Sequence, residues 1–184
     1  VRLAAWCDAY SRDNVQWYVA SVHRGAADRL VVAVTEWASQ ANVECPIRRL
    51  TYRDVPLAIR VDEPARVGID RLLAALAADR IRQRDRAAIV VDLGSAITVD
   101  LLDASGAFCG GAILPGIAMS ARALEEHTDA LPQVALDHLE HPPEPIGMST
   151  VPAIEEGLYW GAVGAIRELI SQMSKDLPAP PDVF

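Results

Sequence analysis

Residues 88–116 read AIVVDLGSAITVDLLDASGAFCGGAILPG, and this stretch decides how the chain folds. It contains three apolar runs that are separated by residues favouring turns. The first run ends in Asp92-Leu-Gly-Ser95, the second ends in Asp103-Ala-Ser-Gly106, and the third begins beside Gly110 and Gly111. Because the connections are short, the pattern predicts three antiparallel strands, at 88–92, 97–102 and 107–114.

Outside this stretch, the apolar pattern alternates between the spacing of strands and that of helices. Short apolar segments typical of strands occur at 16–23, 45–50 and 58–61. Helical spacing predicts helices at 24–40, 70–81, 117–128 and 150–176, with a weaker helical pattern at 1–12. On the helix at 70–81, the expected buried face comprises Leu72, Leu73, Leu76, Ala77 and Ile81.

The order of these elements predicts an α/β fold. Strands and helices alternate before the three consecutive strands, and two helices follow them, which favours a mixed sheet flanked by helices. A charged turn at 84–86 leads us to expect two lobes, residues 1–86 and 87–184.

The composition limits the classes of function. The chain is 51% hydrophobic and 23% charged over 184 residues, which is typical of a globular protein with a sizeable core. Its formal net charge of −8 argues against a nucleic-acid partner but leaves room for a small anionic substrate. The 3 cysteines lack CxxC spacing, and no apolar run reaches membrane-spanning length. We therefore expect a cytoplasmic protein without a membrane partner.

The turn Asp92–Ser95 has two interpretations. Its backbone N–H groups could bind phosphate oxygens while the carboxylate binds a cation. The same residues also suit an ordinary hairpin, which is the favoured interpretation when the turn is taken alone. Gly116 is similarly ambiguous, because it opens a helix whose N–H groups could bind an anion, or it serves only a steric purpose.

Asp70 and Thr150 each precede or open a predicted helix, so both could be N-caps, a role worth about 1 kcal/mol. Alternatively, Asp70 could accept a proton from a substrate hydroxyl while Arg71 binds an anionic group. Thr150 could equally donate its hydroxyl to a ligand. Gly157, Gly161 and Gly164 on the last helix would permit close packing, within the chain or across a dimer.

Two other kinds of site find little support. His138 and His141 have the spacing of a metal site, but no third ligand is in sight. The serines lack the GxSxG elbow of a nucleophile, and the histidines have no evident catalytic partner.

Four segments together resemble the type III pantothenate kinases, a family of the acetate and sugar kinase/Hsp70/actin superfamily. In chain order they are EPARVGIDR, VVDLGSAITVDLLDASGAFCGGAILPGIAMSARAL, TDALPQV and IGMST. The resemblance implies duplicated ribonuclease-H-like lobes and transfer of the ATP γ-phosphoryl group to pantothenate, the first step of coenzyme A biosynthesis. It also implies Mg²⁺, a monovalent cation (K⁺ or NH₄⁺), and a homodimer with the active site at its interface.

The resemblance also implies roles for individual residues. Asp70 matches the family's proton acceptor, and Gly68, Ile69 and Arg71 complete its substrate-binding segment. Asp92 matches the ligand of the monovalent cation, and Gly94 and Ser95 lie where the family binds ATP. Thr150 matches a residue that contacts pantothenate across the dimer interface.

The chain departs from the family pattern in several places. Val61 stands where the family has a Tyr lining the pantothenate site, and Ser95 replaces a Thr. Nothing matches the family's first phosphate loop, Asp-x-Gly-Asn-Thr, or its closing adenosine segment. We therefore expect residues 1–184 to be the middle of a longer kinase, with little kinase activity alone. The alternatives are a non-catalytic regulatory or transcriptional accessory protein, or a kinase of the same superfamily with another acceptor.

Overall fold

The computed structural model describes residues 5, 7, 15–135 and 141–184. The helix predicted at 1–12 therefore lies almost wholly outside the described residues. The chain forms two compact units, the first comprising Val1–Leu57 and Asp62–Leu76 and the second Ala58–Val61 and Ala77–Phe184. Within the described residues, no helix has both the length and the apolar composition needed to span a bilayer.

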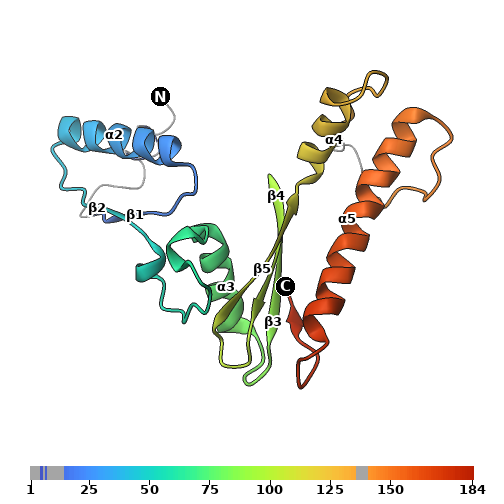
Figure 1. The fold of residues 1–184 in the computed structure, drawn as a ribbon. Coiled ribbons are helices and arrows are strands. Elements are labelled where there is room, and N and C mark those ends of the chain that lie inside the picture. Colours follow the sequence, from blue (N-terminus) through green and yellow to red (C-terminus); the bar gives the residue numbers. More distant parts are fainter. Residues whose placement is uncertain (1–4, 6, 8–14, 136–140) are drawn as a thin grey trace. The chain divides into compact units, whose positions relative to one another are not determined.

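The first unit is built on a parallel strand pair joined by a helix. Strand β1 (Trp17–Val19) pairs with β2 (Ile47–Arg49), and α2 (Arg24–Ala41) connects them (Figure 1). The imidazole Nδ1 of His23 accepts a hydrogen bond from the backbone N–H of Ala26 and so caps the start of α2. The helix thus begins one residue after its cap, as its apolar spacing predicts.

Two short 3₁₀ helices follow β2 and lead into the next helix. They are η1 (Tyr52–Asp54) and η2 (Pro64–Arg66), and α3 (Ile69–Ile81) begins soon after the second. Leu72 is fully buried and Leu73 and Leu76 are half-buried, as predicted, but Ala77 is exposed, and Ala75 and Ala78 are the buried alanines instead. Ile81, which we expected on the buried face, is 71% exposed because it is the last residue of the helix.

The second unit contains a mixed four-stranded sheet in the order β5-β4-β3-β6. Strands β3 (Ala88–Leu93), β4 (Ala96–Leu102) and β5 (Phe108–Pro115) are antiparallel neighbours, which confirms the prediction for residues 88–116. Strand β6 (Asp182–Val183) adds in parallel to β3 and was not predicted, because two residues show no periodicity. The α/β class with a mixed sheet is confirmed.

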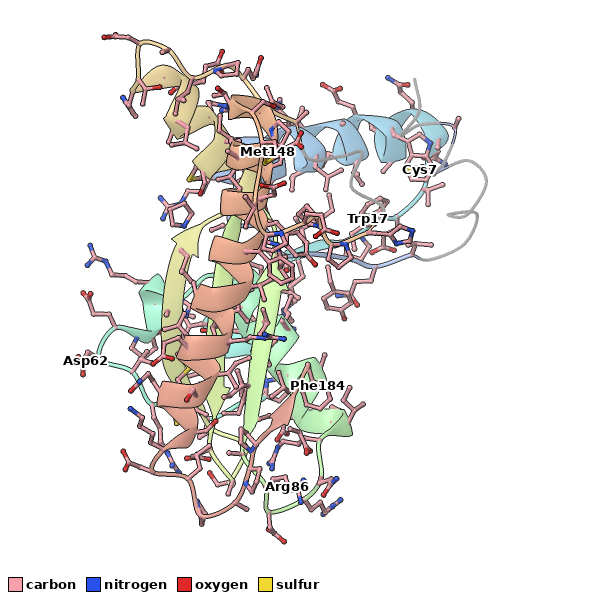
Figure 2. All side chains as sticks on the ribbon, turned by 90° about the vertical axis from the view of Figure 1, so that its right-hand side faces the viewer. Cys7, Trp17, Asp62, Arg86, Met148 and Phe184 are labelled. Carbon is pink, nitrogen blue, oxygen red and sulfur yellow. The ribbon has the colours of Figure 1, made fainter. Side chains whose placement is uncertain are left out.

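Two helices accompany this sheet. Helix α5 (Thr150–Ser174) contacts β4 and α4 (Ile117–Glu126), and Figure 1 shows it running beside the strands. In Figure 2, α5 crosses in front of the sheet, with Met148 just before its first turn. A Cβ added to Gly157, Gly161 or Gly164 would meet no described atom within 4 Å. These glycines therefore serve no close packing within the described part of the chain.

The turn between β4 and β5 is an ordinary hairpin, as predicted. One oxygen of the Asp103 carboxylate accepts hydrogen bonds from the N–H groups of Ser105 and Ala107, and the other pairs with Arg60. Gly106 has a φ of +85°, a conformation that favours glycine. Burial acts to raise the pKa of Asp103, but a hydrogen bond from the Ser105 hydroxyl, the two backbone N–H groups and Arg60 outweigh it, so the pKa is lowered.

Candidate functional site

The turn between β3 and β4 brings the Asp92 carboxylate and the Ser95 hydroxyl to the end of the sheet. Strand β3 ends at Leu93 and β4 begins at Ala96, so Gly94 and Ser95 form the connection. Asp92 lies opposite Thr98 in the antiparallel register, and both Asp92 and Ser95 are exposed. A carboxylate and a hydroxyl in these positions supply the oxygen ligands that hard cations prefer.

The start of α4 lies directly against this turn. The backbone N–H of Gly116, the N-cap of α4, donates to the carbonyl oxygen of Ser95 over 3.2 Å. A Cβ at Gly116 would overlap the carbonyl oxygens of both Gly94 and Ser95, so only glycine allows this approach. No side chain caps α4, which leaves its first N–H groups available to an anion. The structure therefore brings the turn and the start of α4 into direct contact, with the carboxylate, the hydroxyl and the uncapped N–H groups in one region.

The two neighbouring glycines of β5, Gly110 and Gly111, are each favoured over larger residues for a different steric reason. A Cβ at Gly111 would overlap the backbone of Val99 and the side chain of Asp100 on the neighbouring strand. Gly110 has a φ of +93°, and a Cβ there would touch Val61 at 3.5 Å. Val61, which the resemblance aligns with a Tyr of the family, thus lies against Gly110.

Asp100 is a candidate that the sequence interpretation missed. It is only 2% exposed, and the strand alternation places it on the same face of β4 as Thr98, which pairs with Asp92. Its place beside the cross-strand pair of Thr98 and Asp92 makes Asp100 a candidate. The available signal was an aspartate in the middle of the apolar run ITVDLL.

In the first unit, Asp70 is the second residue of α3 rather than its N-cap. The helix begins at Ile69, so Gly68 occupies the position before it, and the N-cap prediction for Asp70 is wrong. The Asp70 Oδ1 atom accepts a hydrogen bond from the N–H of Arg71 over 2.9 Å, and the side chain is exposed. A Cβ at Gly68 would overlap Asp70 Oδ1, so glycine leaves room for the carboxylate.

The N-cap prediction for Thr150 is also wrong, by one residue. Ser149 is the N-cap of α5 and makes no side-chain capping bond, while Thr150 is the first helical residue. Thr150 is exposed and lines a hollow of about 710 Å³ together with Gly147, Ser149 and Ala153. Its hydroxyl is therefore placed where a ligand could reach it.

The histidine pair considered as a metal site cannot be followed in full, because His138 lies outside the described residues. In the described parts of the chain, no three His, Cys, Asp or Glu side chains gather in a way that could hold a metal ion.

Among the predicted site residues, the structure brings Asp92, Ser95 and Gly116 together in the second unit, and Gly68 and Asp70 together in the first.

The sequence pattern of the family described as type III pantothenate kinase matches residues 2–172. The chain belongs to this family. Type III pantothenate kinases have the actin-like ATPase fold, in agreement with the resemblance of the four sequence segments and with the observed α/β architecture.

Individual relatives agree with the family match. The type III pantothenate kinase of Rhodopirellula baltica is 44% identical over 155 residues, which cover 83% of this chain and 55% of the relative. That of Paramagnetospirillum magneticum is 42% identical over 123 residues, covering 67% of this chain and 45% of the relative. That of Acidiphilium cryptum is 42% identical over 127 residues, covering 69% of this chain and 46% of the relative. The chain spans about half the length of these curated relatives.

Proposed function

We propose that this protein phosphorylates pantothenate to 4′-phosphopantothenate at the expense of ATP, the first step of coenzyme A biosynthesis. The observation that carries the proposal is the uncapped start of α4 held against the turn at Gly94 and Ser95. Such an arrangement suits a phosphate group, and the family membership supplies the acceptor.

In the proposed reaction, the exposed carboxylate of Asp70 accepts the proton of the pantothenate primary hydroxyl. The hydroxyl oxygen bonds to the γ-phosphorus while the bond from that phosphorus to the β–γ bridging oxygen breaks, and ADP leaves. A loose phosphoryl-transfer transition state demands mainly positioning and charge stabilisation, so a weak base is sufficient. Gly68, Ile69, Arg71 and Thr150 hold the acceptor in this scheme.

Gly94 and Ser95 bind ATP in the proposal, and Asp92 binds a monovalent cation, K⁺ or NH₄⁺. The exposed oxygen atoms of Asp92 and Ser95 fit such hard cations. Mg²⁺ bound with ATP would supply neutralisation of the phosphate charge. The buried Asp100 lies on the same face of the sheet and would hold the shape of this region.

We further propose a cytoplasmic homodimer of two-lobed subunits. The open space around Gly157, Gly161 and Gly164 supports a contact of α5 with a second copy, because small residues let helices approach closely. Thr150 at the start of this helix would then serve the active site across the interface.

The test compares Asp70→Asn with Asp62→Asn in the product of the complete reading frame, by coupled ATP consumption and mass detection of 4′-phosphopantothenate. Asp62 is also an exposed aspartate of the first unit and provides a matched control. We expect Asp70→Asn to lower turnover about 10²–10⁴-fold and Asp62→Asn to leave it unchanged. Equal turnover of both variants would refute the base role. Absence of pantothenate phosphorylation by the parent would favour the non-catalytic alternative.

A further inference from the structure

A second candidate site lies wholly within the first unit, at the carboxyl ends of its parallel strands. Three segments line a hollow of about 490 Å³: Ser21, Val22 and Arg24 after β1, residues 50–52 after β2, and residues 65–69 at the entrance to α3. Ligands of open α/β sheets bind beyond the carboxyl ends of parallel strands. The volume lies in the range of small-molecule sites.

The lining of this hollow is positively charged although the whole chain is acidic. Arg24 and Arg66 contribute to its wall, and none of the described lining residues is Asp or Glu. The net charge of the chain is −8, whereas this wall carries two guanidinium groups and no carboxylate. The sign of the local charge is therefore opposite to that of the whole chain. A cationic wall of this kind attracts anions.

Nearby carboxylates are already engaged. Asp54 accepts hydrogen bonds from the N–H and the hydroxyl of Thr51 and pairs with Arg48. Glu63 pairs with Arg66 over 2.8 Å, but their side chains are 64% and 78% exposed, so this pair contributes little and a ligand can replace it. In the described part of the chain, Arg24 has no acidic side chain within 4.0 Å.

The hollow adjoins the proposed base. Gly68 lines it, and a Cβ at Gly68 would overlap Asp70 Oδ1 and touch Val22 at 3.4 Å. The Asp70 carboxylate thus stands at the rim of a cationic hollow. A molecule with a hydroxyl at Asp70 and an anionic group farther inside would satisfy both features.

We propose that Arg24 and Arg66 form an oxyanion subsite beside Asp70, which binds either the carboxylate of the acceptor or a phosphate group. The possibility that the acceptor's carboxylate binds there rests on the proposed function, since pantothenate is a hydroxy acid with one carboxylate. A guanidinium group makes strong, charge-assisted hydrogen bonds to both kinds of oxyanion.

Calorimetric titration of the 184-residue chain with three probes, without ATP, tests the subsite. The probes are pantothenate, pantothenyl alcohol, in which a hydroxymethyl group replaces the carboxylate, and inorganic phosphate. If the carboxylate occupies the subsite, pantothenate binds about ten-fold or more tightly than the alcohol, and Arg24→Gln or Arg66→Gln removes that difference. If phosphate occupies it, phosphate binding falls about ten-fold in both variants, and the two organic probes bind alike.

Arg49→Gln is the matched control, because Arg49 lies in the same unit, pairs with Asp28 and does not line the hollow. Arg24→Lys keeps the charge and should retain part of the affinity, which separates lost charge from lost folding. The subsite is refuted if neither anion binds, or if both glutamine variants bind the anions as the parent does. Arginine-dependent binding of pantothenate without its phosphorylation by the complete protein would overturn the proposed function and leave the subsite standing.

Discussion

The backbone N–H of Gly116 donates to the carbonyl oxygen of Ser95 over 3.2 Å, although 20 residues, which form two strands and one hairpin turn, separate them. This bond fixes the start of α4 against the β3–β4 turn. It is possible only because Gly116 lacks a side chain, since a Cβ would overlap the carbonyl oxygens of Gly94 and Ser95. The contact between the β3–β4 turn and the start of α4 therefore depends on one glycine.

Gly116→Ala should destabilise the chain by about 1–3 kcal/mol, because the new methyl group forces the turn and the helix apart. Gly25→Ala in α2 is the control, since a Cβ there makes only ordinary van der Waals contacts, at 3.6 Å or more. That variant should gain about 0.5–1 kcal/mol from the lower conformational freedom of alanine in the unfolded chain. Urea unfolding measures both free energies. Similar values for the two variants would contradict the steric role of Gly116.

The strand pattern of residues 88–116 was predictable because its information is local. Apolar runs and turn residues follow one another closely there, and the observed strands agree within one or two residues. Both N-cap predictions failed because a cap is defined by where the helix begins, and α3 and α5 each begin at a different residue from the one expected. The sequence around Asp70 and around Thr150 is equally compatible with a helix that begins at that residue or at one of its neighbours.

Contacts between segments that are far apart in the chain could not be predicted from the sequence pattern. Examples are the hydrogen bond from Gly116 to Ser95 and the hollow that Arg24 and Arg66 both line. Each depends on the packing of two segments, and nothing in the sequence of one segment indicates that the other lies beside it. Motif order, in contrast, was informative, because it predicted the family that the match over residues 2–172 then showed. Asp100 was missed because a single aspartate inside an apolar run belongs to no recognisable motif.

Asp54 should make stability depend on acid pH. Hydrogen bonds from the N–H and hydroxyl of Thr51, with Arg48, lower the pKa of Asp54 from 3.8 to about 2. Because the folded-state pKa lies below the unfolded value, this stabilisation is present above pH 3.8 and is lost as the pH falls towards 2. Asp54→Asn should flatten the decline of the melting temperature in this window. An unchanged decline, equal to that of Asp62→Asn, would assign the acid sensitivity to other groups.

Asp103 should stabilise the β4–β5 hairpin mainly through its backbone hydrogen bonds. Asp103→Ala removes the acceptor for the N–H groups of Ser105 and Ala107 and should cost about 1–3 kcal/mol. Asp103→Asn keeps an acceptor oxygen but loses the pair with Arg60, which is 60% exposed, so it should cost less than about 1 kcal/mol. A double-mutant cycle with Arg60→Gln isolates the ion pair. A cost of Asp103→Asn as large as that of Asp103→Ala would show that the charge dominates.

His23 should contribute to stability as an unusual N-cap of α2. Its Nδ1 atom accepts the N–H of Ala26 over 3.0 Å, and no acidic residue in the first turn supplements it. His23→Ala leaves that N–H without its acceptor and should lower the free energy of unfolding by about 1 kcal/mol. His23→Asn offers a side-chain oxygen at the same position and should recover most of the loss. Urea unfolding of the two variants decides the matter, because equal losses in both would mean that the imidazole acts by packing rather than by capping.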